Sequence, residues 1–204
     1  MSDKLSHLPR NRRGTAFRES THSAPTAVAI PGYLAGTWKV DPMHSEIAFA
    51  VRLLTVGKMR GRFSRYDVAL VTSEEPLGSS VAATIELASI DSRNEKRDNH
   101  LRSADLLAVD AHPTGSYRST DIRHTDDGWV IGGELTLHGV TRYVPLTVTE
   151  NRFGPDANGG RRVRFCATAQ ISRGEFGIDR WNRGGVVIGD KVSISLEIEA
   201  VRQT

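Results

Sequence analysis

Three observations predict an all-β fold for this chain, an eight-stranded antiparallel barrel. Apolar and polar residues alternate with a period of two along most of the sequence that follows Trp38. Turn-forming residues separate the alternating runs, as in Glu75-Pro76-Leu77-Gly78 and Asp126-Asp127-Gly128. The runs are numerous and evenly spaced, which is typical of a sandwich or a barrel, and barrel closure removes exposed sheet edges.

The alternation gives the expected strands one apolar and one polar face. In the last run, for example, Val192, Ile194 and Leu196 alternate with Ser193 and Ser195. Nine strands are predicted, near residues 35–40, 45–53, 57–71, 79–90, 114–124, 128–138, 141–152, 161–172 and 190–201. A bulged or broken first pair brings the number to eight.

One segment, residues 91–101, does not fit a strand because it is polar and poor in β-branched residues. Ser92 followed three positions later by Glu95 has the pattern of a capping box. The sequence therefore predicts a short helix at about 93–102 that lies across one end of the barrel.

Composition and charge divide the chain into a tail and a body. With 38% hydrophobic and 25% charged residues the chain is globular, and a single cysteine excludes an internal disulfide. Residues 1–30 carry five basic and two acidic residues, which equals the whole net charge of +3. We therefore expect a basic, disordered tail at 1–30 and a single barrel domain at 31–204. A body without basic excess argues against nucleic-acid binding, while the tail could make transient contact with a membrane surface.

The tail contains Arg12-Arg13, which resembles the start of an export signal, but charged residues follow where an apolar core of 7–15 residues is required. No run approaches the roughly 18 apolar residues of a membrane-spanning helix. The sequence therefore predicts a cytoplasmic location.

Catalytic and metal-binding patterns are weak. His44, His100, His112 and His138 lack the spacing of metal ligands, and no glycine-rich phosphate loop is present. The expectation is a protein that is not an enzyme, with no catalytic residues, no metal and no cofactor. An acid/base or metal-dependent enzyme remains the alternative from another class.

Seven segments in order resemble the YceI-like family of polyisoprenoid-binding, lipocalin-like proteins. They are Trp38–Ser45, Gly61–Phe63, Ala88–Ser92, Arg97–Asp105, Arg118–Thr120, Gly133–Thr141 and Ile171–Ile178. The resemblance implies a lipocalin-like barrel whose apolar lumen carries a polyprenyl diphosphate or a prenyl quinone without catalysis. It also implies a monomer or a homodimer, with the isoprenoid lipid as partner. A fatty acid or fatty amide is the alternative ligand, and a fully packed lumen in an interaction module is a further alternative.

The sequence departs from the family at two places. The family often has His where this chain has Leu53, and paired Phe near Leu106-Leu107. Both departures bear on the head-group site and on the width of the lumen.

The candidate ligand-binding residues are inward positions of the expected strands and apolar positions near the helix, and the same positions suit an ordinary core. The lumen candidates are Trp38, Ile47, Phe49, Val51, Phe63, Ile85, Leu101, Leu106, Tyr117, Leu135, Leu137, Val144, Leu146, Phe165, Ala167, Phe176, Ile194 and Leu196. A polar head group needs hydrogen-bond donors at the mouth. Its candidates are Arg97, His100, Arg173, Arg180 and Trp181, although Arg97 could equally form a structural pair with Asp98.

Overall fold

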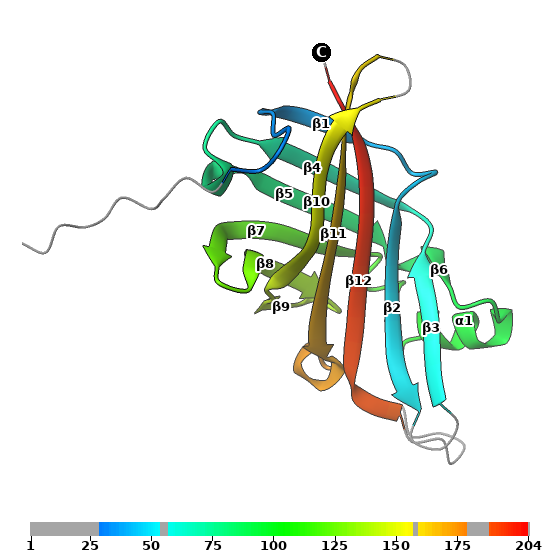
Figure 1. Ribbon diagram of the computed structural model, residues 1–204. Helices are drawn as coiled ribbons and strands as arrows, with labels where there is room; N and C mark the ends of the chain where they lie inside the picture. Colours follow the sequence, from blue (N-terminus) through cyan, green and yellow to red (C-terminus); the bar gives the residue numbers. More distant parts are fainter. Residues whose placement is uncertain (1–28, 54–56, 157–158, 179–187, 204) are drawn as a thin grey trace, which may run out of the picture.

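A computed structural model describes residues 29–53, 57–156, 159–178 and 188–203. Over these residues the chain forms one antiparallel sheet that curls into a barrel (Figure 1). Its strands are β1 (Gly36–Val40), β2 (Glu46–Leu53), β3 (Gly57–Phe63), β4 (Tyr66–Thr72), β5 (Ser80–Glu86), β6 (Ile90–Asp91), β7 (Thr114–Thr125), β8 (Gly128–Leu137), β9 (Val140–Tyr143), β10 (Leu146–Pro155), β11 (Arg161–Ser172) and β12 (Ile188–Arg202). The helical elements are α1 (Glu95–Arg102) and three 3-10 turns, η1 (Pro76–Gly78), η2 (Leu87–Ser89) and η3 (Arg173–Phe176).

The barrel closes through eight strands in the order β1-β4-β5-β7-β8-β10-β11-β12, because β12 also pairs with β1. The long strand β12 pairs with β1 near its C-terminal end and with β2 over its N-terminal half. The sheet then continues through β3 to β6. The predicted eight-stranded antiparallel barrel is confirmed.

Two of the predicted strands are broken in the structure. These breaks account for part of the difference between the twelve described strands and the eight that close the barrel. The strand predicted at 57–71 breaks at Ser64 and Arg65, and the one predicted at 79–90 breaks at η2. Ser89 joins the two breaks, because its hydroxyl donates to the Glu86 carbonyl and accepts from the Arg65 amide. Interruptions side by side let the sheet change direction, so β4 and β5 run obliquely to β2 and β3 in Figure 1.

Helix α1 begins later than the capping pattern predicts. Asn94, and not Ser92, is the N-cap: its side-chain oxygen accepts a hydrogen bond from the Arg97 amide at 3.0 Å. Arg93 adopts a φ of +61°, which separates Ser92 from the helix. Ser92 instead donates through its amide and its hydroxyl to the buried carboxylate of Asp98. This bond ties α1 to the end of β6, beside β3 (Figure 1).

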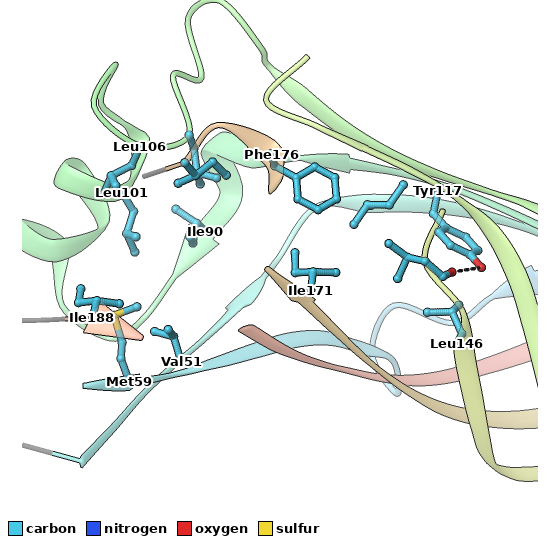
Figure 2. Close-up of a cluster of buried hydrophobic side chains, with 14 of the residues drawn as sticks. Val51, Met59, Ile90, Leu101, Leu106, Tyr117, Leu146, Ile171, Phe176 and Ile188 are labelled. Atoms are coloured by element: carbon cyan, nitrogen blue, oxygen red, sulfur yellow. Dashed lines mark hydrogen bonds between the residues drawn. The ribbon is translucent and has the colours of Figure 1, made fainter. Parts of the chain in front are cut away.

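Two apolar clusters fill the interior. The larger cluster lies along the lower barrel and includes all the residues that Figure 2 labels. The smaller contains Trp38, Val163 and Ala200, packed by Leu34, Val40, Leu70 and Phe153. Trp38 donates from Nε1 to Thr72 Oγ1 at 2.7 Å, so its polar edge is satisfied inside the cluster. In the described part of the chain, no helix has the length and hydropathy needed to cross a membrane.

Candidate functional site

The barrel interior holds an apolar cavity of about 210 Å³. It extends from α1 past the strand breaks to Leu70 and Val81, and its lining comes from both the curved sheet and the segment around α1. Fifteen of the eighteen lumen candidates line it. They are Ile47, Phe49, Val51, Phe63, Ile85, Leu101, Leu106, Tyr117, Leu135, Leu137, Val144, Leu146, Phe165, Ile194 and Leu196. Their contact with a ligand stays a prediction.

Three lumen candidates do not line this cavity. Trp38 belongs to the smaller cluster at the other end of the barrel, where it packs edge-on against Phe153 with ring centroids 5.6 Å apart. Ala167 is buried in the main cluster, and its short side chain leaves the wall to larger neighbours. Phe176, in η3, is fully buried and packs within the main cluster (Figure 2).

Many lining residues lie outside the sequence-based selection. They include Met59, Val68, Leu70, Val81, Ile131, Ile171, Ile188, Val192 and Ile198. Val192 and Ile198 lie two residues from the predicted Ile194 and Leu196 on β12, so the same alternation identifies them. Val68 and Leu70 lie on β4, from which no residue was predicted. Leu107, which follows α1, also lines the cavity and was noted only as a departure from the family.

Tyr117 places one polar group inside the wall. Its hydroxyl donates to the Ile131 and Val144 carbonyls at 3.0 and 3.2 Å, so the hydroxyl is satisfied by the protein itself (Figure 2). Burial raises the pKa of Tyr117 far above its ordinary value, with smaller contributions from Tyr143 and Asp121. The ring lies against Gly133, where an added Cβ would come within 2.5 Å of it. Tyr117 is therefore neutral and fixed.

Arg173 is the single charged side chain in the lining as far as the structure describes it. It lies at the start of η3, and its guanidinium donates to the Ile178 and Gly189 carbonyls at 2.6 and 3.2 Å. These bonds hold the cation near the end of the cavity while leaving further N–H groups of its five. The head-group prediction for Arg173 is therefore compatible with its position and stays untested.

The other head-group candidates differ in their surroundings. Arg97 donates to the Ser92 hydroxyl and carbonyl, at 2.7 and 2.5 Å, so it serves the same junction as Asp98. Its contacts are therefore structural, but they go to Ser92 and not to Asp98, with which the sequence predicted a pair. His100 is half-buried on α1 and has interactions within the protein. Arg180 and Trp181 lie outside the described residues.

Within the described ranges, no cluster of three or more His, Cys, Asp or Glu side chains could hold a metal ion. His112 and His138 pack edge-on, with ring centroids 5.0 Å apart, and His138 Nδ1 lies 3.1 Å from the Phe176 carbonyl oxygen. This pair supports η3 and does not reach the cavity lining. The arrangement provides a container for an apolar molecule.

A closed antiparallel barrel around an apolar cavity is an architecture that can hold a small ligand. The YceI-like domain model matches residues 38–200, and the chain belongs to this family. Its similarity to other members is moderate and extends over most of its length. A UPF0312 protein of Pseudomonas aeruginosa is 33% identical over 173 residues, which cover 83% of this chain and 89% of that protein. A UPF0312 protein of Serratia proteamaculans is 34% identical over 148 residues, 71% of this chain and 77% of that protein.

Solved structures share the fold at low sequence identity. Burkholderia cenocepacia BcnA superposes with a TM-score of 0.65 at 22% identity, covering 79% of this chain and 99% of BcnA. A polyisoprenoid binding domain from Saccharophagus degradans, implicated in plant cell wall breakdown, gives a TM-score of 0.61 at 14% identity, with 83% and 100% covered. These likenesses independently support the barrel.

Proposed function

We propose that this protein binds a long-chain isoprenoid lipid in the barrel cavity and carries it without chemical change. The observation that carries the proposal is the apolar cavity, whose described lining has a single charged side chain, at one end. The family and the polyisoprenoid binding domain of S. degradans support the choice of ligand class. A fatty acid or fatty amide of equal length is the competing ligand.

The physics of the cavity suits such a ligand. Each buried CH₂ contributes about 0.8 kcal/mol, so burial of ten groups yields roughly 8 kcal/mol before the ordering costs of binding. Aliphatic and aromatic walls contribute this energy at any point along a chain and need no directional contacts. The barrel can therefore hold a chain of repeating apolar units with little specific chemistry.

A polar head group would lie at the end of the cavity marked by Arg173. Its position beside η3 and near the C-terminal side of β11 leaves the rest of the cavity to the hydrocarbon. A charge-assisted hydrogen bond from a guanidinium to a diphosphate is stronger than a neutral one. If the protein binds a polyprenyl diphosphate at least about tenfold more tightly than the corresponding polyprenol, the result would fit this assignment.

The test is a binding titration of the full chain with a polyprenol, read out by isothermal titration calorimetry. Ala83 faces the cavity, and Ala83→Leu adds three carbons to it. Since those carbons displace roughly three ligand carbons at about 0.8 kcal/mol each, the variant should bind about 60-fold more weakly. Ala82→Leu is the matched control, because Ala82 is the next residue on β5 and is exposed on the outer face.

Equal affinity of Ala83→Leu and the wild type would place the ligand outside the cavity and refute the proposal. Tighter binding of a fatty acid of the same length than of the polyprenol would assign the barrel to the competing ligand class. In that outcome the cavity is confirmed as the site and the isoprenoid is not.

A further inference from the structure

A second, smaller cavity of about 70 Å³ lies at the end of the barrel away from α1. Its wall is mainly apolar, with polar atoms from a few short side chains. It is formed by residues such as Tyr33, Thr72, Trp129, Val148, Asn151 and Phe153. None of these residues was selected from the sequence, and none lines the main cavity. We call this space the end cavity.

Four side chains line both cavities: Leu70, Val81, Ile131 and Phe165. They come from β4, β5, β8 and β11, which are spread around the closed ring of strands. Leu70 and Val81 are direct neighbours in the register of β4 and β5. The four therefore form a layer across the barrel, which we call the partition.

The partition is made of side chains and not of backbone. Leu70, Val81 and Phe165 are half-buried at inward positions, so they present surface to the two spaces. Truncating such a side chain opens a passage without breaking a strand. The end cavity is then available to an apolar group that comes from the main cavity.

Packed aromatic rings form part of the far side of the end cavity, whose lining also includes the exposed Ser80. Phe153 contacts Tyr33 and Trp38 edge-on, with ring centroids at 5.1 and 5.6 Å. The Tyr33 hydroxyl donates to the Ser73 carbonyl at 2.6 Å, which anchors the ring. A chain that passes the partition would therefore meet these anchored rings in the end cavity.

From this geometry we infer that the partition sets the longest isoprenoid chain that the barrel accepts, and that the end cavity is a reserve subsite for terminal isoprene units. The inference rests on the proposed function. With the partition intact, the main cavity ends at Phe165 and its three companions. A longer chain must either displace these side chains or leave its last unit in water, which costs apolar burial.

The test is a length series of polyprenols with the same alcohol head group, titrated against the full chain and its variants. For the wild type, affinity should rise with chain length and then level off or fall at a limiting length. Phe165→Ala should move that limit to longer chains, with at least a tenfold gain in affinity for the first chain beyond the wild-type limit. That gain corresponds to about 1.4 kcal/mol.

Three further variants keep the result interpretable. Val81→Ala makes a milder opening if Phe165→Ala does not fold, and it should shift the limit in the same direction. Val71→Ala is the matched control, because Val71 follows Leu70 on β4, is exposed on the outer face and lines neither cavity. It should leave the limit unchanged. In Phe165→Ala/Val148→Phe the new ring fills the end cavity, so the limit should return toward that of the wild type.

Trp129 provides a local readout, since it lines the end cavity and not the main one. Long chains should change the emission of Phe165→Ala, and Trp129→Phe in that background should remove most of the change. Folded partition variants with an unmoved limit would overturn this inference while leaving polyprenol binding intact. Failure of the wild type to bind any polyprenol would instead refute the proposed function.

Discussion

Removal of the Tyr117 hydroxyl is a direct test of how the cavity wall is held together. Tyr117 is 8% exposed and donates to the carbonyls of Ile131 and Val144, which joins β7 to β8 and to the link between β9 and β10. Tyr117→Phe keeps the ring and deletes the donor. A hydrogen bond contributes about 1 kcal/mol, and buried carbonyls left without a partner raise the cost to about 3 kcal/mol. We expect a loss of about 1–3 kcal/mol in the free energy of unfolding.

The same variant should change how stability depends on pH. Burial raises the pKa of Tyr117 in the folded state, while in the unfolded chain the pKa is near 10. The unfolded chain therefore releases its proton first. The contribution of Tyr117 is complete below pH 10 and is lost as the pH rises above 10, at up to about 1.4 kcal/mol per pH unit.

The assay is urea unfolding at pH 8, 10 and 11, with Tyr143→Phe as the control because Tyr143 is 52% exposed. The difference between the wild type and Tyr117→Phe should narrow from pH 10 to pH 11, and at pH 8 Tyr143→Phe should cost less than Tyr117→Phe does. A Tyr117→Phe variant that is as stable as the wild type at pH 8 would refute the account of the wall. A difference that stays constant up to pH 11 would refute the assignment of a neutral, buried hydroxyl.

Two further stability predictions follow from buried polar contacts. Trp38→Phe removes the donor to Thr72 Oγ1 and should lower the free energy of unfolding by about 1 kcal/mol or more. Thermal unfolding measures the loss, and an unchanged melting temperature would contradict the prediction. Asp98→Ala leaves the Ser92 amide without its acceptor and should cost about 1–3 kcal/mol in urea unfolding. Glu95→Ala is its control, since Glu95 is exposed on the same helix, and equal losses in the two variants would show that the junction adds nothing.

The fold could be predicted from the sequence because the alternation is a local property. A period of two assigns each side chain to a face whatever the partner strand is, and the inward set follows from it. This is why Phe49, Leu135 and Leu196 were found as inward residues before their neighbours in the sheet were known.

Position along the barrel axis could not be predicted in the same way. Trp38 has the inward character of the cavity-lining residues, yet strand register places it in the separate cluster with Val163 and Ala200. The partition depends on register as well. Phe165 and Val81 are far apart in the sequence, and only strand order and register place both side chains between the two cavities. Local patterns contain no information on register between distant strands.

The helix start shows a different limit. Ser92 and Glu95 have the spacing of a capping box, but Asn94 is an equally good cap and lies nearer the helix. The left-handed conformation of Arg93 and the buried carboxylate of Asp98 decide between them. Those tertiary features are invisible to a motif. The division into a tail and a barrel domain, the cytoplasmic location, the absence of a cofactor and the oligomeric state stay predictions.

Native mass spectrometry of the full chain, purified without detergent, shows whether the cavity holds an isoprenoid lipid. We predict a stoichiometric adduct whose mass, confirmed in an organic extract, matches a prenyl quinone or a polyprenyl phosphate. Ala83→Leu should retain less of this adduct than Ala82→Leu does. A wild-type protein that carries no adduct, and that takes up no added polyprenyl lipid, would contradict the proposed function.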